Sequence, residues 1–168
     1  MFHKQVLPNV WVVYDIFKGI DVDHNTLFTG EKRLFKFKNE HEHCELWQYE
    51  FEDKDNQFQY IHQYIKDNFI HKDFIVRKGV QEILHNKFIP PHSDQEHIGA
   101  ITVFLNKIWE PHWGGHNCTV DDNWETVHTQ KPVYGTGVYI EAPCQHFTLP
   151  VFSDHRRRTL QFFYDEIT

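Results

Sequence analysis

The chain of 168 residues carries 17 lysine and arginine residues against 24 aspartate and glutamate residues, so its formal charge is −7 when histidine is neutral. That length suits one domain, the apolar content of 40% is too high for a disordered chain, and the negative charge argues against binding of duplex nucleic acid through a basic face. Fourteen histidines stand out, because imidazole is both a metal ligand and a group that titrates near neutral pH.

The sequence favours a cytoplasmic protein without a membrane partner. The N-terminal residues lack the apolar segment of a signal peptide, and no apolar run approaches the roughly 18 residues of a membrane span. Three cysteines without C-x-x-C spacing indicate neither a disulfide framework nor a structural zinc site. We expect residues 1–168 to form a single domain, with N-terminal strands and a supporting helix in 1–73 and the core with its site in 74–168.

The first part of the chain predicts a few strands and one good helix. Residues 10–14, 34–37 and 45–51 are rich in aromatic and aliphatic side chains and predict short strands, whereas residues 21–31 predict a loop. Between Asn56 and Phe69, apolar side chains recur at helical spacing. This pattern predicts an amphipathic helix, capped by Asn56, whose apolar side packs on a sheet.

After residue 73 the pattern changes to short strands separated by turns. Aromatic and β-branched runs predict strands at residues 74–76, 99–105, 138–140, 146–151 and 159–164. Proline and glycine pairs lie between several of these runs. Many short strands after one helix predict a mainly β fold, a sandwich or barrel with helical support.

Histidine and a carboxylate separated by one residue on a strand point to the same face, where they can bind one divalent metal ion. Three pairs have this spacing: His43-Cys44-Glu45, His71-Lys72-Asp73 and His92-Ser93-Asp94. The composition alone predicts about two such pairs, so the spacing needs support from its context. The first pair lies in a polar run and the second follows the predicted helix, and we expect both to be solvated.

The third pair has a more informative context. His92 and Asp94 follow two prolines, which favour extended backbone, and precede an apolar strand. A third ligand would have to come from another strand, and His146, on an extended run after Pro143, is the candidate. The alternative interpretation of His146 is a core histidine whose hydrogen bonds are satisfied.

An arginine run at residues 156–158 leads directly into the last predicted strand. Alternation places Arg157, Thr159 and Gln161 on one face and the two flanking arginines on the other. An arginine that points into a barrel is an unpaired buried charge unless it meets an anion. A carboxylate bound by both guanidinium nitrogens, with the Thr159 hydroxyl nearby, would satisfy it. The alternative is three surface arginines on an edge strand.

Several motifs follow one another along the chain in an order that resembles one enzyme family. They are His92-x-Asp94, the strand 101–105 with Asn106, the segment Trp109 to Gly115, the strand and turn 138–143, His146 with Pro150 four residues later, and Arg157-x-Thr159-Leu160. Over about residues 74–164 the chain is similar to the iron(II)- and 2-oxoglutarate-dependent oxygenases, particularly their prolyl 4-hydroxylase-like branch. The resemblance implies a double-stranded β-helix, the jelly roll also found in cupins, with helices on its major sheet.

The resemblance also implies roles for individual residues. His92, Asp94 and His146 become the iron(II) ligands, Arg157 the partner of the distal carboxylate of 2-oxoglutarate, and Thr159 its hydroxyl neighbour.

The chain departs from the family pattern at three places. Where family members often place an acidic residue after the double glycine, this chain has His116, and where many have a cosubstrate-binding tyrosine it has the strand Thr102-Val103-Phe104. We expect Thr102 or another group to substitute for that tyrosine. If the last strand slipped by one residue, Arg156 or Arg158 would take the place of Arg157.

The activity implied by the resemblance is hydroxylation of a C–H bond in a protein or peptide side chain, with proline as the first candidate, and release of succinate and carbon dioxide. Ascorbate is the expected supporting reductant. Alternatives are the same chemistry on a free amino acid or a nucleobase, a cupin-like metal enzyme without 2-oxoglutarate, and a non-enzymatic β-sandwich that binds a partner or has a structural role. Four aromatic side chains either line the mouth of a peptide site or fill the core: Trp109, His112, Trp113 and Trp124.

Overall fold

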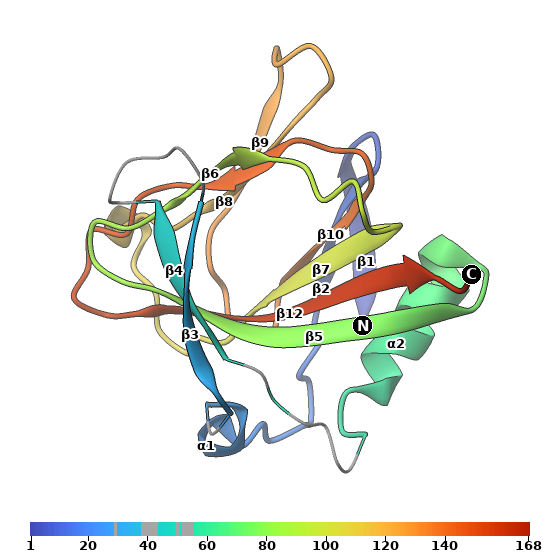
Figure 1. Ribbon diagram of the computed structural model, residues 1–168, viewed down its shortest axis with the longest axis horizontal. Coiled ribbons are helices and arrows are strands. Elements are labelled where there is room, and N and C mark those ends of the chain that lie inside the picture. Colours follow the sequence, from blue (N-terminus) through green and yellow to red (C-terminus); the bar gives the residue numbers. More distant parts are fainter. Residues whose placement is uncertain (29, 38–43, 50, 52–55) are drawn as a thin grey trace.

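Strands with one apolar and one more polar face build two antiparallel sheets that lie against each other (Figure 1). The computed structural model describes residues 1–28, 30–37, 44–49, 51 and 56–168. In spatial order, the large sheet contains β1 (Phe2–Leu7), β2 (Val10–Tyr14), β10 (Gly137–Glu141), β7 (Gly99–Phe104), β12 (Arg157–Glu166), β5 (Phe74–Ile83), β4 (Glu45–Tyr49) and β3 (Lys32–Lys36). The small sheet contains β6 (Ile89–His92), β11 (His146–Thr148), β8 (Asn117–Val120) and β9 (Val127–Gln130). The mainly β fold with a jelly-roll core, predicted from the sequence, is confirmed.

Strand β12 lies in the middle of the large sheet. One of its faces packs in the main apolar cluster and the other faces the small sheet. The strand pairs with β7 on one side and β5 on the other. Its residues Leu160, Phe162 and Tyr164 are fully buried on the outer face of the large sheet, where α2 (Gln59–Ile65) contributes Ile61 to the same apolar cluster. The alternate residues of β12 face the small sheet, as the sequence alternation predicts.

The supporting helix forms where it is predicted, within residues 56–69, but with different ends. It begins at Gln59 after Phe58, and no side chain caps it. Asn56 has a left-handed φ of 50°, and its carbonyl accepts a hydrogen bond from the Gln59 amide. Asparagine tolerates this turn conformation, so the residue makes the turn before the helix instead of capping it. At the other end the α-helix continues into a π-helical turn, Lys66–Ile70.

Several short elements were not predicted. Strand β1 is a charged, exposed edge strand, and β8 is fully buried although three of its four residues are asparagine, cysteine and threonine, so neither has the expected strand pattern. The expected loop 21–31 contains the short helix α1 (His24–Leu27), next to which Val22 and Leu27 are buried in the main apolar cluster.

Strands from both parts of the chain enter the large sheet, since β1 to β4 precede residue 73 and β5, β7, β10 and β12 follow it. The three cysteines are buried and form no disulfide with one another. Within the described ranges, none of the helices combines the length and the apolar composition needed to cross a bilayer.

Candidate active site

The small sheet brings two predicted ligands face to face. Strands β6 and β11 are antiparallel neighbours, and their register places His146 opposite His92, with ring centroids 4.3 Å apart. Strand β6 lies at the edge of its sheet, where prolines are tolerated, and its register with β11 is irregular between His146 and Thr148. The two prolines thus form the strand that carries His92.

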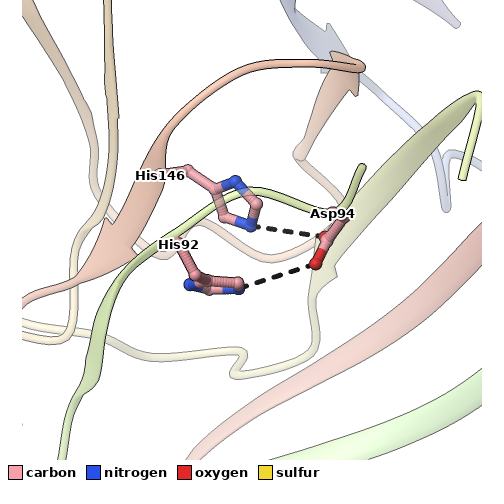
Figure 2. A group of neighbouring side chains, drawn as sticks. All are labelled: His92, Asp94 and His146. Atoms are coloured by element: carbon pink, nitrogen blue, oxygen red, sulfur yellow. Dashed lines mark ion pairs between the residues drawn. The ribbon is translucent and has the colours of Figure 1, made fainter. Parts of the chain in front are cut away.

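Asp94 completes the group from the turn that follows β6. Its Oδ1 lies 3.7 Å from Nε2 of His92 and its Oδ2 lies 3.4 Å from Nε2 of His146. The three ligand atoms all lie within 4.8 Å of one another, and both rings point toward the carboxylate (Figure 2). Among the described residues, no other group of three histidine, cysteine or carboxylate side chains has this geometry.

Backbone carbonyls orient both imidazoles. Nδ1 of His92 donates a hydrogen bond to the Pro90 carbonyl over 2.8 Å, and Nδ1 of His146 donates to the Cys144 carbonyl over 3.2 Å. A carbonyl can only accept, so the proton of each ring lies on Nδ1 and the Nε2 lone pair is directed at Asp94. This is the arrangement that holds a metal-binding histidine in the correct tautomer.

The charge states also suit a divalent cation. Burial lowers the pKa of His92 below its ordinary value, and the neighbouring His146 lowers this pKa further. Burial alone would raise the pKa of Asp94, but the contact with His146 outweighs burial and leaves this pKa below its ordinary value. A neutral imidazole beside an ionised carboxylate is what metal binding requires.

A cavity of about 280 Å³ between the two sheets adjoins the three side chains. Its buried end is lined by Arg157, Asn117 and Thr148, which are at most 4% exposed. Toward the surface it is lined by aromatic rings, among them the exposed Phe35 and the half-buried Phe163. The cavity therefore joins a set of metal-ligating side chains to a buried cation.

Arg157 is buried with two of its three guanidinium nitrogens unpaired. It is 1% exposed, its Nε donates to the Gly115 carbonyl over 2.6 Å, and its guanidinium carbon lies 5.4 Å from the centre of the Phe104 ring. Nη1 and Nη2 have no hydrogen-bond partner among the described residues. Burial lowers the pKa of Arg157 to about 9, so the guanidinium is still charged at neutral pH.

The two flanking arginines lie on the opposite face of β12. Arg156 donates to Glu82 over 3.1 Å and Arg158 donates to the same carboxylate over 2.8 Å. Glu82 is 1% exposed and also accepts a hydrogen bond of 2.6 Å from the Tyr49 hydroxyl. Of the three arginines, only Arg157 lines the cavity, which answers the question of register left open by the sequence.

The residues present fit iron(II) and 2-oxoglutarate. Two imidazoles and one carboxylate form the donor set of iron(II) oxygenases and leave three positions of an octahedral ion free. Two unpaired nitrogens on one planar guanidinium match the two oxygens of a carboxylate. A 2-oxo acid with a second carboxylate would satisfy the buried charge of Arg157 and reach the metal-ligating group with its other end.

Of the other two predicted cosubstrate residues, Thr102 lines the cavity, whereas Thr159 is buried behind the residues that line it. Thr102 lines the cavity and donates to the side-chain oxygen of Gln161 over 2.8 Å. Thr159 is fully buried, and its hydroxyl accepts a hydrogen bond of 3.1 Å from Gln161. Gln161 itself lines the cavity and connects the two threonines. The roles of Thr102 and Thr159 in binding a cosubstrate remain predictions.

The four aromatic side chains between the triad's two halves do not line the cavity. Trp109 is 6% exposed and donates to the Gly114 carbonyl over 2.9 Å, and Trp113 stacks on His155. Trp124 is exposed in a turn. The structure thus supports core filling for Trp109 and loop packing for Trp113.

The other two histidine–carboxylate pairs are His71 with Asp73 and His43 with Glu45. His71 is an exposed, left-handed residue at the end of the helical segment, and Asp73 pairs with Lys66, so this pair is solvated as predicted. His43 lies outside the described residues.

Sequence reasoning missed several residues of the cavity. Gln161 shares the predicted face of Arg157, and that alternation could have identified it. Asn117 stands two residues after Gly115 in an unpredicted strand, so no sequence signal marked it. Phe35 and Gln48 come from β3 and β4, which carry no motif, and only the order of strands in the sheet brings them to the site.

The sequence matches no protein-family model and none of the curated proteins. Its structure is similar to solved structures. A prolyl-4-hydroxylase from Pseudomonas putida superposes with a TM-score of 0.61 at 17% identity, covering 73% of this chain and 72% of that one. An oxidoreductase of the 2OG-Fe(II) oxygenase family from Burkholderia pseudomallei superposes with a TM-score of 0.73 at 11% identity, covering 94% and 86%.

A third similar structure is a prolyl hydroxylase from Trichoplax adhaerens in complex with a peptide fragment of the hypoxia inducible factor oxygen degradation domain. Its TM-score is 0.55 at 13% identity, over 71% of this chain and 62% of that one. At such identities the likeness concerns the fold. The chain therefore has the fold of the 2-oxoglutarate- and iron(II)-dependent oxygenases, prolyl 4-hydroxylases among them, as the sequence resemblance implies.

Proposed function

We propose that the protein is an iron(II)- and 2-oxoglutarate-dependent dioxygenase that hydroxylates a C–H bond in a protein or peptide side chain, with proline as the first candidate. One observation carries the proposal: His92, Asp94 and His146 converge at the same cavity in which Arg157 holds two unpaired guanidinium nitrogens. The similarity of fold supports it.

In this proposal the site residues have separate roles. His92, Asp94 and His146 would bind iron(II), and Arg157 would bind the distal carboxylate of 2-oxoglutarate. When bound, these groups supply the oxidising chemistry: 2-oxoglutarate and O₂ become succinate and carbon dioxide, and one oxygen atom enters the substrate's C–H bond. The carbonyls of Pro90 and Cys144 fix the two imidazole tautomers, so the ligands are preorganised.

A peptide or protein substrate fits the exposed side of the cavity. Phe35, Phe37 and Phe163 line it there, and aromatic rings provide apolar contact for an aliphatic ring such as that of proline. The similar structure from Trichoplax adhaerens contains a peptide. We also infer a cytoplasmic location, because three cysteines that form no disulfide suit a reducing compartment.

Metal-dependent stabilisation tests the site without a known substrate. We expect manganese(II) together with 2-oxoglutarate to raise the melting temperature by roughly 5–10 °C at saturating concentrations. The variants His92→Ala and Asp94→Ala should lose this shift, because each removes a metal ligand. The matched control is His112→Ala, which removes an exposed histidine outside the cavity and should keep the shift.

Turnover tests the reaction itself. Iron(II), 2-oxoglutarate, ascorbate and oxygen should give succinate, and proline-containing peptides should increase its rate. Stimulation by free amino acids or nucleobases instead would assign the substrate to those classes. If the protein binds metal but 2-oxoglutarate has no effect, a cupin-like enzyme without this cosubstrate would be indicated. If the protein neither binds metal nor forms succinate, the proposal would be contradicted.

A further inference from the structure

Besides Arg157, the buried end of the cavity contains the almost fully enclosed amide side chain of Asn117. Asn117 is 4% exposed, lines the cavity, and has a side-chain oxygen without a hydrogen-bond partner among the described residues. A buried amide without a partner costs about 1–3 kcal/mol. An unpaired amide oxygen and an unpaired guanidinium that line the same cavity therefore indicate a ligand that satisfies both.

The register of β8 explains why these groups meet. The Gly115 carbonyl accepts the hydrogen bond from Nε of Arg157 and so directs the rest of the guanidinium. Asn117 follows two residues later at the first position of β8, opposite Thr148 of β11, which also lines the cavity. One short segment thus orients the arginine and places the amide at the same end.

We propose that Asn117 donates a hydrogen bond to the same carboxylate that Arg157 binds, and so belongs to the binding site for 2-oxoglutarate. This inference rests on the proposed function. A half-turn of the side-chain amide exchanges its oxygen and its NH₂ group, so the amide can present a donor to an anion. In this role Asn117 supplies the additional polar contact for which the sequence suggested Thr102, which is already bound to Gln161.

The test measures binding, without turnover. Manganese(II)-loaded protein is titrated with 2-oxoglutarate by calorimetry, and manganese(II) affinity is measured separately. Asn117→Leu keeps the volume and removes the amide, and it should weaken 2-oxoglutarate binding about ten- to a hundredfold, since a hydrogen bond to a charged group is lost. Asn117→Asp keeps the shape and adds a negative charge, and it should weaken binding further. Manganese(II) affinity should be unchanged in Asn117→Leu.

Gln130→Ala is the matched control. Gln130 pairs with Asn117 across β8 and β9 but does not line the cavity, so its loss should leave 2-oxoglutarate affinity unchanged. Wild-type affinity in both Asn117→Leu and Asn117→Asp would overturn the inference while leaving the proposed function intact. Failure of the wild-type protein to bind 2-oxoglutarate would contradict the proposed function and this inference with it.

Discussion

Arg157 is the residue at which stability and the proposed function conflict. A fully buried guanidinium with two unpaired nitrogens disfavours the folded state, and this cost is reflected in its pKa, which burial lowers to about 9. Below that pH the whole cost of the buried charge is present, because the unfolded chain holds the proton more tightly. A bound dicarboxylate would offset this cost.

We expect Arg157→Met to stabilise the ligand-free protein. The thioether side chain fills similar space without a charge, and replacing buried charges by apolar groups stabilises proteins by about 1–4 kcal/mol in favourable cases. Urea unfolding of the ligand-free variant should show the gain, while calorimetry should show that 2-oxoglutarate binding is lost. Arg77→Met, at an exposed ion pair with Asp165, should give no gain in stability. A ligand-free Arg157→Met that is less stable than wild type would contradict this account of the buried charge.

Only part of the site can be predicted from residues alone. His92, Asp94 and Arg157 could be proposed from spacing and strand alternation only together with the order of the motifs, because the same spacing also occurs at two other histidines. Asn117 and Phe35 could not be proposed, because their place in the cavity depends on which strands become neighbours. That neighbourhood arises from contacts between segments far apart in the sequence.

At the scale of elements, the turn before β8 requires its two glycines, because residues with a side chain rarely adopt its backbone conformation. Gly114 has a φ of 69°, and a Cβ added there would lie 2.1 Å from the Pro150 carbonyl oxygen. Gly115 has a φ of 64° and lies against Trp109 and Arg157. The close approach of these backbones lets β8 begin directly beside Arg157.

We predict that Gly114→Ala destabilises the protein more than Gly19→Ala. Both positions have positive φ values, so both variants incur backbone strain, and the ψ of −143° at Gly114 is one that side chains rarely allow. Only Gly114→Ala adds a clash with backbone, since nothing lies within 4 Å of a Cβ at Gly19. The difference in free energy of unfolding should be about 1–3 kcal/mol, measured by urea denaturation. Equal effects would show that β8 and Pro150 separate easily.

The elements themselves were predicted unevenly. Strands such as β7, β10 and β12 are apolar and β-branched or aromatic, and their existence follows from composition. Strands β1, β8 and β9 are rich in polar residues and form because neighbouring strands supply their hydrogen bonds. The cap expected at Asn56 failed for a local reason, since that residue adopts the left-handed turn before the helix.

Over the whole molecule, one buried carboxylate connects three strands of the large sheet. Glu82 on β5 bonds Tyr49 on β4 and both Arg156 and Arg158 at the start of β12. Burial raises the pKa of Glu82, but these hydrogen bonds and charges outweigh it, and the pKa lies below its ordinary value of 4.5.

This network predicts that part of the free energy of unfolding is lost at acidic pH. Because the pKa of Glu82 is lower in the folded state than in the unfolded chain, its contribution is present above about pH 4.5 and is lost as the pH falls through the folded-state pKa. Glu82→Gln should therefore lower the free energy of unfolding by about 1–3 kcal/mol at pH 7 and by less near pH 3.5. The exposed Glu31→Gln should leave the urea midpoint unchanged at pH 7. A deficit of Glu82→Gln that stays constant down to pH 3.5 would exclude this origin.

The two ends of the proposed cosubstrate site lie on different sheets. His92 and His146 belong to the small sheet and Arg157 to the large one. Facing sheets pack about 10 Å apart, at a separation set by all the side chains between them. The interval between metal ligands and guanidinium is thus a property of the sandwich as a whole. If the proposed cosubstrate binds there, the thickness of the sandwich would limit the length of the dicarboxylic acid that can span the cavity, and core residues far from the cavity would help to set that length.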